Sequence, residues 1–352
     1  MRPGRPSGSV LRMNIKEHEP LRLHTTFRAG GPARYFIEAA TEGEIKEAVA
    51  FAHRQGLPVF VLGGGSNVLA GDGGFHGVVV HIATRGIQTA GETEGGIEVI
   101  AAAGEDWDAL VALAVERRLY GLENMSLIPG QVGAAVAGNI GAYGAEVKDT
   151  LRWAEALDTR TGAIRRWTRD ECQFGYRRSF FKTREGRGWI VLRAGFALSK
   201  RGAVNTEYKD VREFFSRPGS ATPTLAGVRE AVMAIRRGKL PDLARIGTAG
   251  SFFKNPVMSR ADFEALAARH PGLPGHDDGN GLVKVPLGWI LDKVCGLKGV
   301  RRGRAGTYQG QALVLVNDGG TAAAVEALAE EMAQAVKAKT GLNVEWEVER
   351  LP

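Results

Sequence analysis

Three consecutive glycines, Gly63–Gly65, follow a short apolar run and constrain this sequence more than any other feature. The run Pro58–Leu62 predicts a buried strand, and the glycines remove every side chain where that strand ends. A backbone without side chains can turn sharply, and its N–H groups can converge on an anion. Ser66 and Asn67 add short polar side chains suited to a pyrophosphate or a ring carbonyl. Alone, three glycines more often form an ordinary turn, and their spacing is not the G-x-G-x-x-G of a dinucleotide fingerprint.

A second glycine-rich stretch, Ser126–Gly144, favours a ligand over an ordinary turn. It reads S-L-I-P-G-Q-V-G-A-A-V-A-G-N-I-G-A-Y-G, with Asn139 and Tyr143 as its polar and aromatic exceptions. Residues this small let a backbone approach a flat ligand closely, although they also allow tight packing of backbone on backbone with no ligand. Because two such stretches occur in one non-repetitive sequence, a large bound cofactor explains them better than packing alone.

The hydrophobic pattern around these stretches predicts an α/β chain. Thr41 and Glu44 have the spacing of a capping box, and the apolar residues after them repeat at helical spacing between two predicted strands. Ser, Pro, Gly and Thr gather at Ser216–Thr224 and predict a linker. Further strands are predicted at Gly77–Ile82, Ile97–Ala103, Leu151–Asp158, Ile164–Thr168, Trp189–Leu198, Gln311–Asn317 and Asn343–Val348, further helices after Asp106 and at Leu225–Arg237, Leu287–Val294 and Ala322–Lys339, and a loop at Pro271–Gly281.

Composition narrows the class of protein. The 352 residues allow two or three domains, and the net charge of +7 comes from dispersed basic pairs. This charge favours anionic small molecules and indicates no nucleic-acid partner. Two distant cysteines, seven histidines without ligand spacing and no apolar run of the ~20 residues of a membrane span predict a cytoplasmic protein without a metal. Residues 1–12 lack the apolar core of a signal peptide and predict a flexible tail, which leaves Met1 and Met13 both open as the start.

Six motifs, in a fixed order from Met13 to the C-terminus, carry a resemblance to a known family. They are L-G-G-G-S-N-V-L at Leu62–Leu69, I-P-G-Q-V-G at Ile128–Gly133, G-N-I-G-A-Y-G at Gly138–Gly144, F-G-Y-R-R-S at Phe174–Ser179, G-S-F-F-K-N-P at Gly250–Pro256 and E-W-E-V at Glu345–Val348. With them the sequence resembles the UDP-N-acetylenolpyruvoylglucosamine reductases, also called UDP-N-acetylmuramate dehydrogenases. These FAD enzymes complete UDP-N-acetylmuramate for bacterial peptidoglycan, and so serve cell-wall growth, cell shape and division. Glu207–Asp210 matches a tyrosine loop of the family's longer, type I branch.

The resemblance implies an α+β and α/β fold of the PCMH type, related to vanillyl-alcohol oxidase. Two lobes would hold FAD, and a smaller C-terminal α+β domain would cover the substrate. The expected boundaries are residues 13–83 for the first lobe, 84–238 for the second and 239–337 for the substrate domain, with 338–352 returning to the first lobe and the PCMH-type region at 28–199. A monomer is expected.

Carried over position by position, the resemblance implies a ligand role for residues of each motif. FAD pyrophosphate would lie on the backbone of Gly63–Asn67, and Ile128–Gly144 would line the flavin. NADPH and then the enolpyruvyl UDP-sugar would use one site in turn. The implied cofactor-binding residues are Gly63, Gly64, Gly65, Ser66, Asn67, Ile128, Pro129, Gly130, Gly133, Asn139, Gly141, Ala142 and Tyr143. The implied substrate-binding residues are Tyr176, Tyr208, Lys239, Asn255 and Gln311, and Lys254 is a further candidate for phosphate on charge alone.

The implied reaction delivers hydride to C3 of the enolpyruvyl group and then a proton to C2. Negative charge that spreads into the carboxylate requires a cation and a hydrogen-bond donor, and Arg177 and Glu347 match these roles. Glu347 would act best in its protonated form, which a dry pocket favours. Ser251, followed by two phenylalanines, matches the proton donor. Without the ordered motifs, each of these residues is more simply a surface or strand residue.

The position of the acid has an alternative. The tail reads E-W-E-V-E-R-L-P where the family usually ends in E-V-R, so alignment on the preserved E-V selects Glu347. Counting from Asn343 selects Glu349 instead. Two residues apart in a strand, both acids would lie on one face.

Two other functions compete with this interpretation. A different flavoenzyme of the same fold, such as an oxidase of a hydroxy acid or alcohol, would need neither Ser251 nor cations for UDP. A basic protein that binds nucleotide sugar or nucleic acid without turnover would need no flavin.

Overall fold

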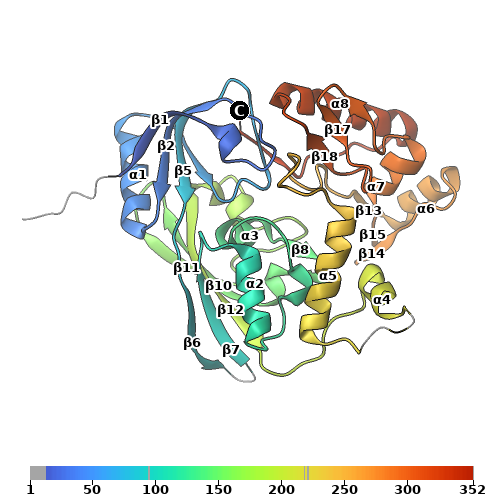
Figure 1. Ribbon diagram of the computed structural model, residues 1–352, viewed down its shortest axis with the longest axis horizontal. Helices are drawn as coiled ribbons and strands as arrows, with labels where there is room; N and C mark the ends of the chain where they lie inside the picture. Colours follow the sequence, from blue (N-terminus) through green and yellow to red (C-terminus); the bar gives the residue numbers. More distant parts are fainter. Residues whose placement is uncertain (1–12, 94–95, 218, 220–221, 352) are drawn as a thin grey trace, which may run out of the picture.

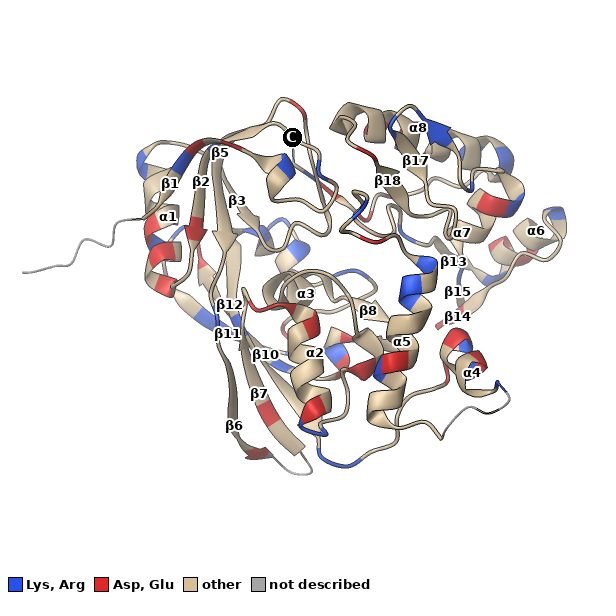
Figure 2. Cartoon of the chain, viewed as in Figure 1, with Lys and Arg blue, Asp and Glu red and all other residues tan. Residues whose placement is uncertain are grey.

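The computed structural model describes residues 13–93, 96–217, 219 and 222–351. Figure 1 shows two sheet-containing lobes, with the N-terminal lobe stacked on a second, longer sheet, and a C-terminal domain beside them. Helix α5 (Leu225–Lys239) lies between the second lobe and the C-terminal domain. Figure 2 shows Lys and Arg scattered over the whole ribbon, as expected from the dispersed basic pairs.

The first lobe is built on a four-stranded sheet with the order β1-β2-β5-β3. β2, β5 and β3 are parallel, and α1 packs on them as the crossover. The predicted capping box is confirmed: Thr41 Oγ1 accepts from the N–H of Glu44, and Glu44 Oε2 accepts from the N–H of Thr41. The elements are β1 (Ile15–Pro20), a 3-10 turn (Leu21–Leu23), β2 (Pro32–Ala39), α1 (Glu42–Arg54), β3 (Val59–Leu62), β4 (Val68–Ala70) and β5 (Phe75–Ile82).

The prediction that Pro58–Leu62 is a buried strand is wrong in one respect. The strand exists as β3, but it is the last strand in the order of its sheet and only Leu62 is buried. Val61 is 37% exposed. An apolar run of this length cannot distinguish a central strand from an edge strand, because its partners lie elsewhere in the sequence. The glycines therefore leave the sheet at its edge, where Gly63 and Gly64 are accessible and Gly65 is buried.

The second lobe is an antiparallel five-stranded sheet with the order β11-β10-β12-β7-β6. Helix α2, capped by Asp106 as predicted, buries Trp107, Leu110 and Val111, and α3 packs against β12. The glycine-rich stretch thus contains a short helix that the sequence pattern did not indicate. The elements are β6 (Ile87–Thr93), β7 (Gly96–Ala102), α2 (Trp107–Glu116), η2 (Glu123–Met125), α3 (Val132–Gly138), β8 (Gly141–Ala142), β9 (Ala145–Glu146), η3 (Val147–Asp149), β10 (Leu151–Asp158), β11 (Ile164–Thr168), η4 (Phe180–Lys182), η5 (Gly186–Gly188) and β12 (Trp189–Ser199).

The C-terminal domain packs three helices over two small sheets with its own core cluster. The predicted loop at Pro271–Gly281 is wrong, since it contains β14, and the predicted strand at Gln311–Asn317 shortens to β18. The predicted linker Ser216–Thr224 connects α4 to α5 and includes residues 218 and 220–221, which lie outside the described residues. α4 (Lys209–Phe215) precedes this domain and packs on α5. The elements of the C-terminal domain are β13 (Val257–Ser259), α6 (Arg260–Arg269), β14 (His276–Gly279), β15 (Leu282–Lys284), α7 (Leu287–Trp289), the π-helix η6 (Ile290–Val294), β16 (Arg301–Arg302), β17 (Ala305–Thr307), β18 (Leu315–Asn317) and α8 (Ala322–Thr340).

The end of the chain pairs with the first lobe. β19 (Glu349–Leu351) runs parallel to β4, with Glu349 opposite Val68 and Leu351 opposite Ala70. The predicted last strand, Asn343–Val348, is wrong by several residues: that segment makes only an isolated bridge, between Trp346 and Phe253. The chain therefore passes the Gly250–Pro256 motif immediately before it joins the strand that follows the three glycines.

Candidate active site

The two glycine-rich stretches meet face to face. A Cβ on Gly64 would lie 3.1 Å from the Cα of Gly130, and Ser66 Oγ donates to the carbonyl oxygen of Pro129 at 2.9 Å. Gly130 has φ +120°, a conformation that side chains rarely allow. The structure thus places the predicted pair of stretches side by side, although they come from different lobes.

The residues around this junction fit a bound dinucleotide such as FAD. A cavity of about 300 Å³, at the low end of the ~300–1,000 Å³ of small-molecule sites, opens on Gly63 and Gly64 from the first-lobe side, where residues 23–26 and His81 complete its lining. The side-chain oxygen Oε1 of Gln131 is buried beside Gly63 without a hydrogen-bond partner among the described residues. A buried acceptor of this kind normally has a partner, so a donor from a ligand fits here. Gly63–Asn67 and Ile128–Gly133 are the segments that would hold such a group.

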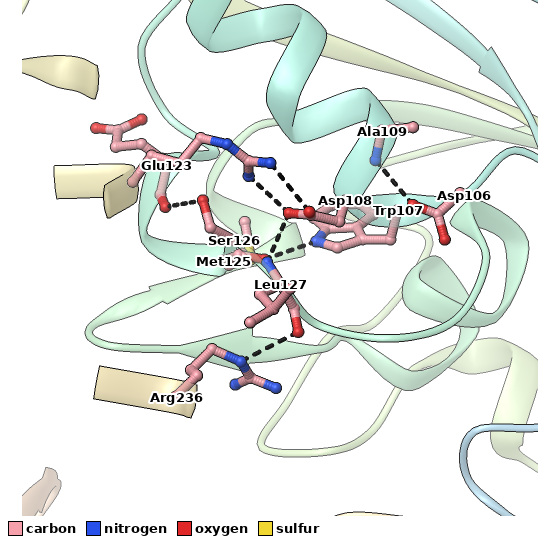
Figure 3. Close-up of polar contacts among 10 residues, drawn as sticks. Asp106, Trp107, Asp108, Ala109, Glu123, Met125, Ser126, Leu127 and Arg236 are labelled. Carbon is pink, nitrogen blue, oxygen red and sulfur yellow. Dashed lines mark hydrogen bonds and ion pairs between the residues drawn. The ribbon is translucent and has the colours of Figure 1, made fainter. Parts of the chain in front are cut away.

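A polar network behind the second stretch fixes its position (Figure 3). Asp108 Oδ1 accepts from the N–H of Leu127 at 2.6 Å, and Arg236 Nε donates to the carbonyl oxygen of Leu127 at 3.1 Å. Trp107 Nε1 donates to the carbonyl oxygen of Met125 at 3.1 Å. Arg229 on α5 holds both oxygens of Asp108, at 2.6 and 3.0 Å. Leu127, which directly precedes Ile128–Gly133 and has φ +59°, is therefore hydrogen-bonded through both its N–H and its carbonyl oxygen.

Asn139 and Tyr143, the polar and aromatic exceptions of the second stretch, have different surroundings. Asn139 is 1% exposed, and its Nδ2 donates to Glu146 Oε2 and to the carbonyl oxygen of Gly175. Its side chain is therefore committed to the protein itself. Tyr143 is half-buried with φ +50°, and the charge of Arg236 acts on its hydroxyl. Burial raises the pKa of Tyr143 to about 12, so this phenol is a neutral group over the physiological range.

Arg177 lies where several motifs converge. Its Nε is 2.6 Å from Glu347 Oε1, and both of its Nη atoms lie 3.3 Å from the carbonyl oxygen of Gly141. Arg177 has φ +52°, an unusual backbone conformation for a residue with a side chain. The structure thus brings Phe174–Ser179, Gly138–Gly144 and Glu345–Val348 together at one guanidinium.

The surroundings of the two candidate acids differ. The Glu347 side chain is 15% exposed, its N–H donates to the carbonyl oxygen of Phe252, and its own carbonyl oxygen accepts from Asn67 Nδ2 at 3.0 Å. Glu349 is exposed, and its backbone N–H donates to the carbonyl oxygen of Asn67. Of the two, Glu347 is the acid that contacts Arg177.

Ser251 directly precedes Phe252, the residue whose carbonyl oxygen accepts from the N–H of Glu347. It forms an isolated bridge with Val314, and Phe252 and Phe253 after it are buried. Because the carbonyl oxygen of Phe252 accepts from Glu347, the predicted proton donor and the predicted acid occupy adjacent segments. Lys254 pairs with Glu345 at 2.9 Å on the outer side of the same segments.

The residues predicted to contact the substrate form two groups near Arg177, Glu347 and Ser251. Tyr208 is 45% exposed at the start of α4 and meets the ring of Tyr143 edge-on at 5.3 Å. Asp210 pairs with Lys239 at 2.7 Å, which ties α4 to the end of α5. The last turn of α5 carries Arg236, Arg237 and Lys239, blue in Figure 2.

The second group belongs to the C-terminal domain and the loop before Arg177. Lys284, on β15, lies 4.2 Å from the centre of the Tyr176 ring. Asn255 Oδ1 accepts from the N–H of Leu287, and Gln311 Oε1 lies so close to Gly288 that a Cβ there would be 2.4 Å away. Both side chains lie beside the start of α7, and that of Asn255 is hydrogen-bonded to it.

Three cations of the site were not indicated by the sequence patterns: Arg236, Lys284 and Lys182. Arg236 precedes Lys239 by less than one helical turn, and Lys182 follows the F-G-Y-R-R-S motif, so position beside a motif was the available signal. Among the described residues there is no cluster of three or more His, Cys, Asp or Glu that could hold a metal ion. Within those residues, no helix combines the length and the apolar character needed to cross a membrane.

Comparison with known proteins agrees with this geometry. The family described as FAD binding domain matches residues 33–168, and the family described as UDP-N-acetylenolpyruvoylglucosamine reductase, C-terminal domain, matches residues 242–351. The enzyme of that name from Pseudomonas aeruginosa is 42% identical over 96% of this chain and 99% of its own. The one from Ralstonia nicotianae is 43% identical over 95% and 98%.

A solved structure extends the likeness to the fold. The crystal structure of UDP-N-acetylenolpyruvylglucosamine reductase from Thermus caldophilus superposes with a TM-score of 0.67 at 27% identity, over 97% of this chain and 100% of that one. Both lobes and the C-terminal domain are therefore shared, which confirms the expected flavin fold. With relatives this similar over nearly its whole length, the chain belongs to the UDP-N-acetylenolpyruvoylglucosamine reductase family.

Proposed function

We propose that this chain reduces the enolpyruvyl group of UDP-N-acetylglucosamine enolpyruvate to UDP-N-acetylmuramate, with NADPH as hydride donor and FAD as bound cofactor, and that Arg177, Glu347 and Ser251 act on the reacting group. Family membership supports the reaction and the cofactor. The observation that carries the residue roles is the contact between Arg177 and Glu347 beside Gly141. When bound, FAD supplies hydride at its N5 atom.

Arg177 binds the substrate carboxylate in this proposal. A guanidinium stays charged at all relevant pH values and can hold a carboxylate through two parallel hydrogen bonds. Its Nη atoms otherwise face a neutral carbonyl, that of Gly141, at the long distance of 3.3 Å, so a carboxylate is a stronger partner for them. As negative charge spreads from C2 into the carboxylate, the cation stabilises it.

In this proposal Glu347 supplies a hydrogen bond and Ser251 supplies the proton. Glu347 forms an ion pair with Arg177, 2.6 Å from an Nε that is not aligned for a hydrogen bond, and in its protonated form it would donate to the developing oxyanion. Ser251 Oγ gives its proton to C2 after the hydride has reached C3, and the buried phenylalanines beside it exclude water from that transfer.

The remaining residues divide the substrate between two domains. Tyr208 and Lys239 would contact the uridine and diphosphate from α4 and α5, and Tyr176, Asn255 and Gln311 would contact the sugar end. Residues 13–83 and 84–238 would hold FAD, and 239–337 would cover the substrate, with 338–352 completing the first lobe. The pairing of β19 with β4 supports this last assignment. A cytoplasmic monomer that supplies cell-wall precursor for growth, shape and division completes the proposal.

The test is the visible spectrum of the purified holoenzyme under anaerobic conditions. NADPH is expected to bleach the flavin, and the enolpyruvyl UDP-sugar is expected to restore its absorbance. A flavin that is restored only by oxygen would contradict the proposal and favour an oxidase. Protein that neither contains nor takes up flavin would overturn it entirely.

A further inference from the structure

The hairpin turn Tyr143–Gly144 is bonded by two asparagine side chains. It joins β8 to β9, and both of its residues have positive φ, +50° and +82°, as a tight two-residue hairpin turn requires. Asn124 Nδ2 donates to the carbonyl oxygen of Tyr143 at 2.9 Å, and Asn205 Nδ2 donates to that of Gly144 at 3.2 Å. Side chains from η2 and from the segment before α4 therefore fix both central carbonyls of the turn.

Asn124 also binds the segment before α4. Its Nδ2 donates to the backbone carbonyl oxygen of Asn205 at 2.9 Å, and a primary amide has one N–H for each of these two carbonyls. Asn124 is 2% exposed, its neighbours Glu123 and Met125 are buried too, and the indole of Trp107 donates to the carbonyl oxygen of Met125. A buried and well-anchored side chain thus holds two backbone segments at once.

The bond to Asn205 reaches Tyr208 through three residues of chain. Asn205 Oδ1 accepts from the N–H of Glu207 at 3.0 Å, which forms a turn directly before Tyr208. Tyr208 is the N-cap residue of α4, and its ring meets the ring of Tyr143 edge-on at 5.3 Å. Asn124 therefore bonds the backbone under both rings of this pair, that of Tyr143 directly and that of Tyr208 through Asn205.

We propose that Asn124 is a positioning residue for the nucleotide sugar, and that it acts by fixing Tyr208 against Tyr143. Tyr208 is 45% exposed, so much of its surface is left for a ligand while one edge contact sets its place. A side chain that is already placed loses less conformational entropy when a ligand binds, so affinity rises without a new contact. The inference rests on the proposed contact of Tyr208 with the uridine and diphosphate.

A role in stability alone is the alternative explanation. Removal of a buried amide leaves its carbonyl partners without a donor, which is costly in any part of a fold. That role predicts a lower midpoint of urea unfolding for Asn124→Ala. Any loss of affinity would then be the same whether the ring of Tyr208 is present or absent.

The experiment is a double-mutant cycle between Asn124→Ala and Tyr208→Ala. Titration calorimetry measures binding of the enolpyruvyl UDP-sugar to the oxidised holoenzyme, in which no turnover occurs without NADPH. Asn205→Ala loosens the same segment from a half-buried position and leaves Asn124 in place. Thr340→Ala is the control, because Thr340 is buried and its hydroxyl also makes two hydrogen bonds, but at the end of α8.

We expect Asn124→Ala to weaken binding by about tenfold, the magnitude of about one net hydrogen bond. In the Tyr208→Ala background the same substitution should change the affinity by less than about twofold, because the side chain through which it acts is already absent. Asn205→Ala should also weaken binding in the parent but not in that background. Flavin content should stay at the parent value in every variant, and Thr340→Ala should keep the parent affinity.

Equal losses for Asn124→Ala with and without the ring of Tyr208 would overturn the inference, as would loss of flavin in Asn124→Ala or an equal loss of affinity in Thr340→Ala. If Asn124→Ala does not fold, Asn205→Ala decides by the same comparison. Unchanged binding in Asn124→Ala beside weakened binding in Tyr208→Ala would overturn the inference alone. Unchanged binding in Tyr208→Ala would contradict the proposed role of Tyr208, and the inference would fail with it.

Discussion

The side-chain amide of Asn67 donates to the backbone carbonyl oxygen of Glu347 at 3.0 Å, so the loop after the three glycines directly positions an acid near the end of the chain. Glu347 in turn contacts Arg177. Through this contact, the expected pyrophosphate loop and the expected catalytic pair form one connected unit.

Replacement of the two candidate acids should separate them. Glu347→Gln is expected to lower kcat by at least about 100-fold, because the proposed hydrogen-bond donor and the ion-pair partner of Arg177 are altered together. Glu349→Gln should stay near the parent value, since Glu349 is exposed and contacts Asn67 only through its backbone. Steady-state turnover of both variants checks this, and the reverse ranking would show that the acid is Glu349.

Loss of the Ser251 hydroxyl should affect only one half of the reaction. Ser251→Ala is expected to slow re-oxidation of the reduced enzyme by the enolpyruvyl UDP-sugar by ~10²–10⁴-fold, the usual range for a lost general acid. Reduction by NADPH should proceed at the parent rate. Stopped-flow absorbance resolves the two halves, with Ser216→Ala, an exposed serine at the end of α4, as control. Equal slowing of both halves would assign Ser251 a structural role.

A side chain at the junction of the glycine-rich stretches should release the cofactor. In Gly130→Ala the new Cβ would lie 2.6 Å from Ser66 Oγ, and φ +120° would be strained. The hydroxyl must then leave the carbonyl of Pro129, so we expect less flavin per protein after gel filtration. Gly73→Ala is the matched control, because nothing lies within 4 Å of its Cβ and its φ is not positive. Full flavin content in Gly130→Ala would place the cofactor elsewhere.

The network behind Leu127 should contribute stability that depends on pH. Burial alone would raise the pKa of Asp108, but the hydrogen bonds from Arg229 and Leu127 outweigh it and hold the pKa below its ordinary value. Such a group stabilises the fold above its unfolded pKa, ~3.9, and this stability is lost as the pH falls through the folded value. Asp108→Asn should therefore cost about 1–3 kcal/mol at pH 7 and much less near pH 3.

Urea unfolding at both pH values measures this difference. Asp106→Asn is the control on the same helix, because Asn caps a helix about as well as Asp and the cap bond to Ala109 can persist. A difference between Asp108→Asn and the parent that stays constant with pH would refute the assigned electrostatic origin.

Local patterns predicted those parts of the fold that depend on neighbours in sequence. The Thr41–Glu44 capping box, the cap at Asp106 and most of the strands follow from residues a few positions apart, and the structure confirms them. The edge position of β3, the short β14 and the true start of β19 depend on pairing partners far along the chain, so apolar alternation alone could not give them.

The candidate active site was likewise predictable only in part from the sequence. The order of the motifs pointed to Arg177, Glu347 and Ser251, but their mutual arrangement required the structure. Lys182 illustrates the limit: in the sequence it is one lysine after two phenylalanines, and only the structure places its Nζ beside Gly138. Arg236 is likewise defined by its contact with Leu127, more than a hundred positions away.

The pairing of β19 with β4 also sets an order of assembly during synthesis. During translation Gly63–Asn67 is synthesised early, whereas Glu345–Leu351 is synthesised after the other segments that contact Arg177. An incomplete nascent chain therefore has an unpaired β4 and an Arg177 that lacks Glu347. The contacts that Asn67, β4 and Arg177 make with Glu345–Leu351 are therefore formed only once that segment has been synthesised.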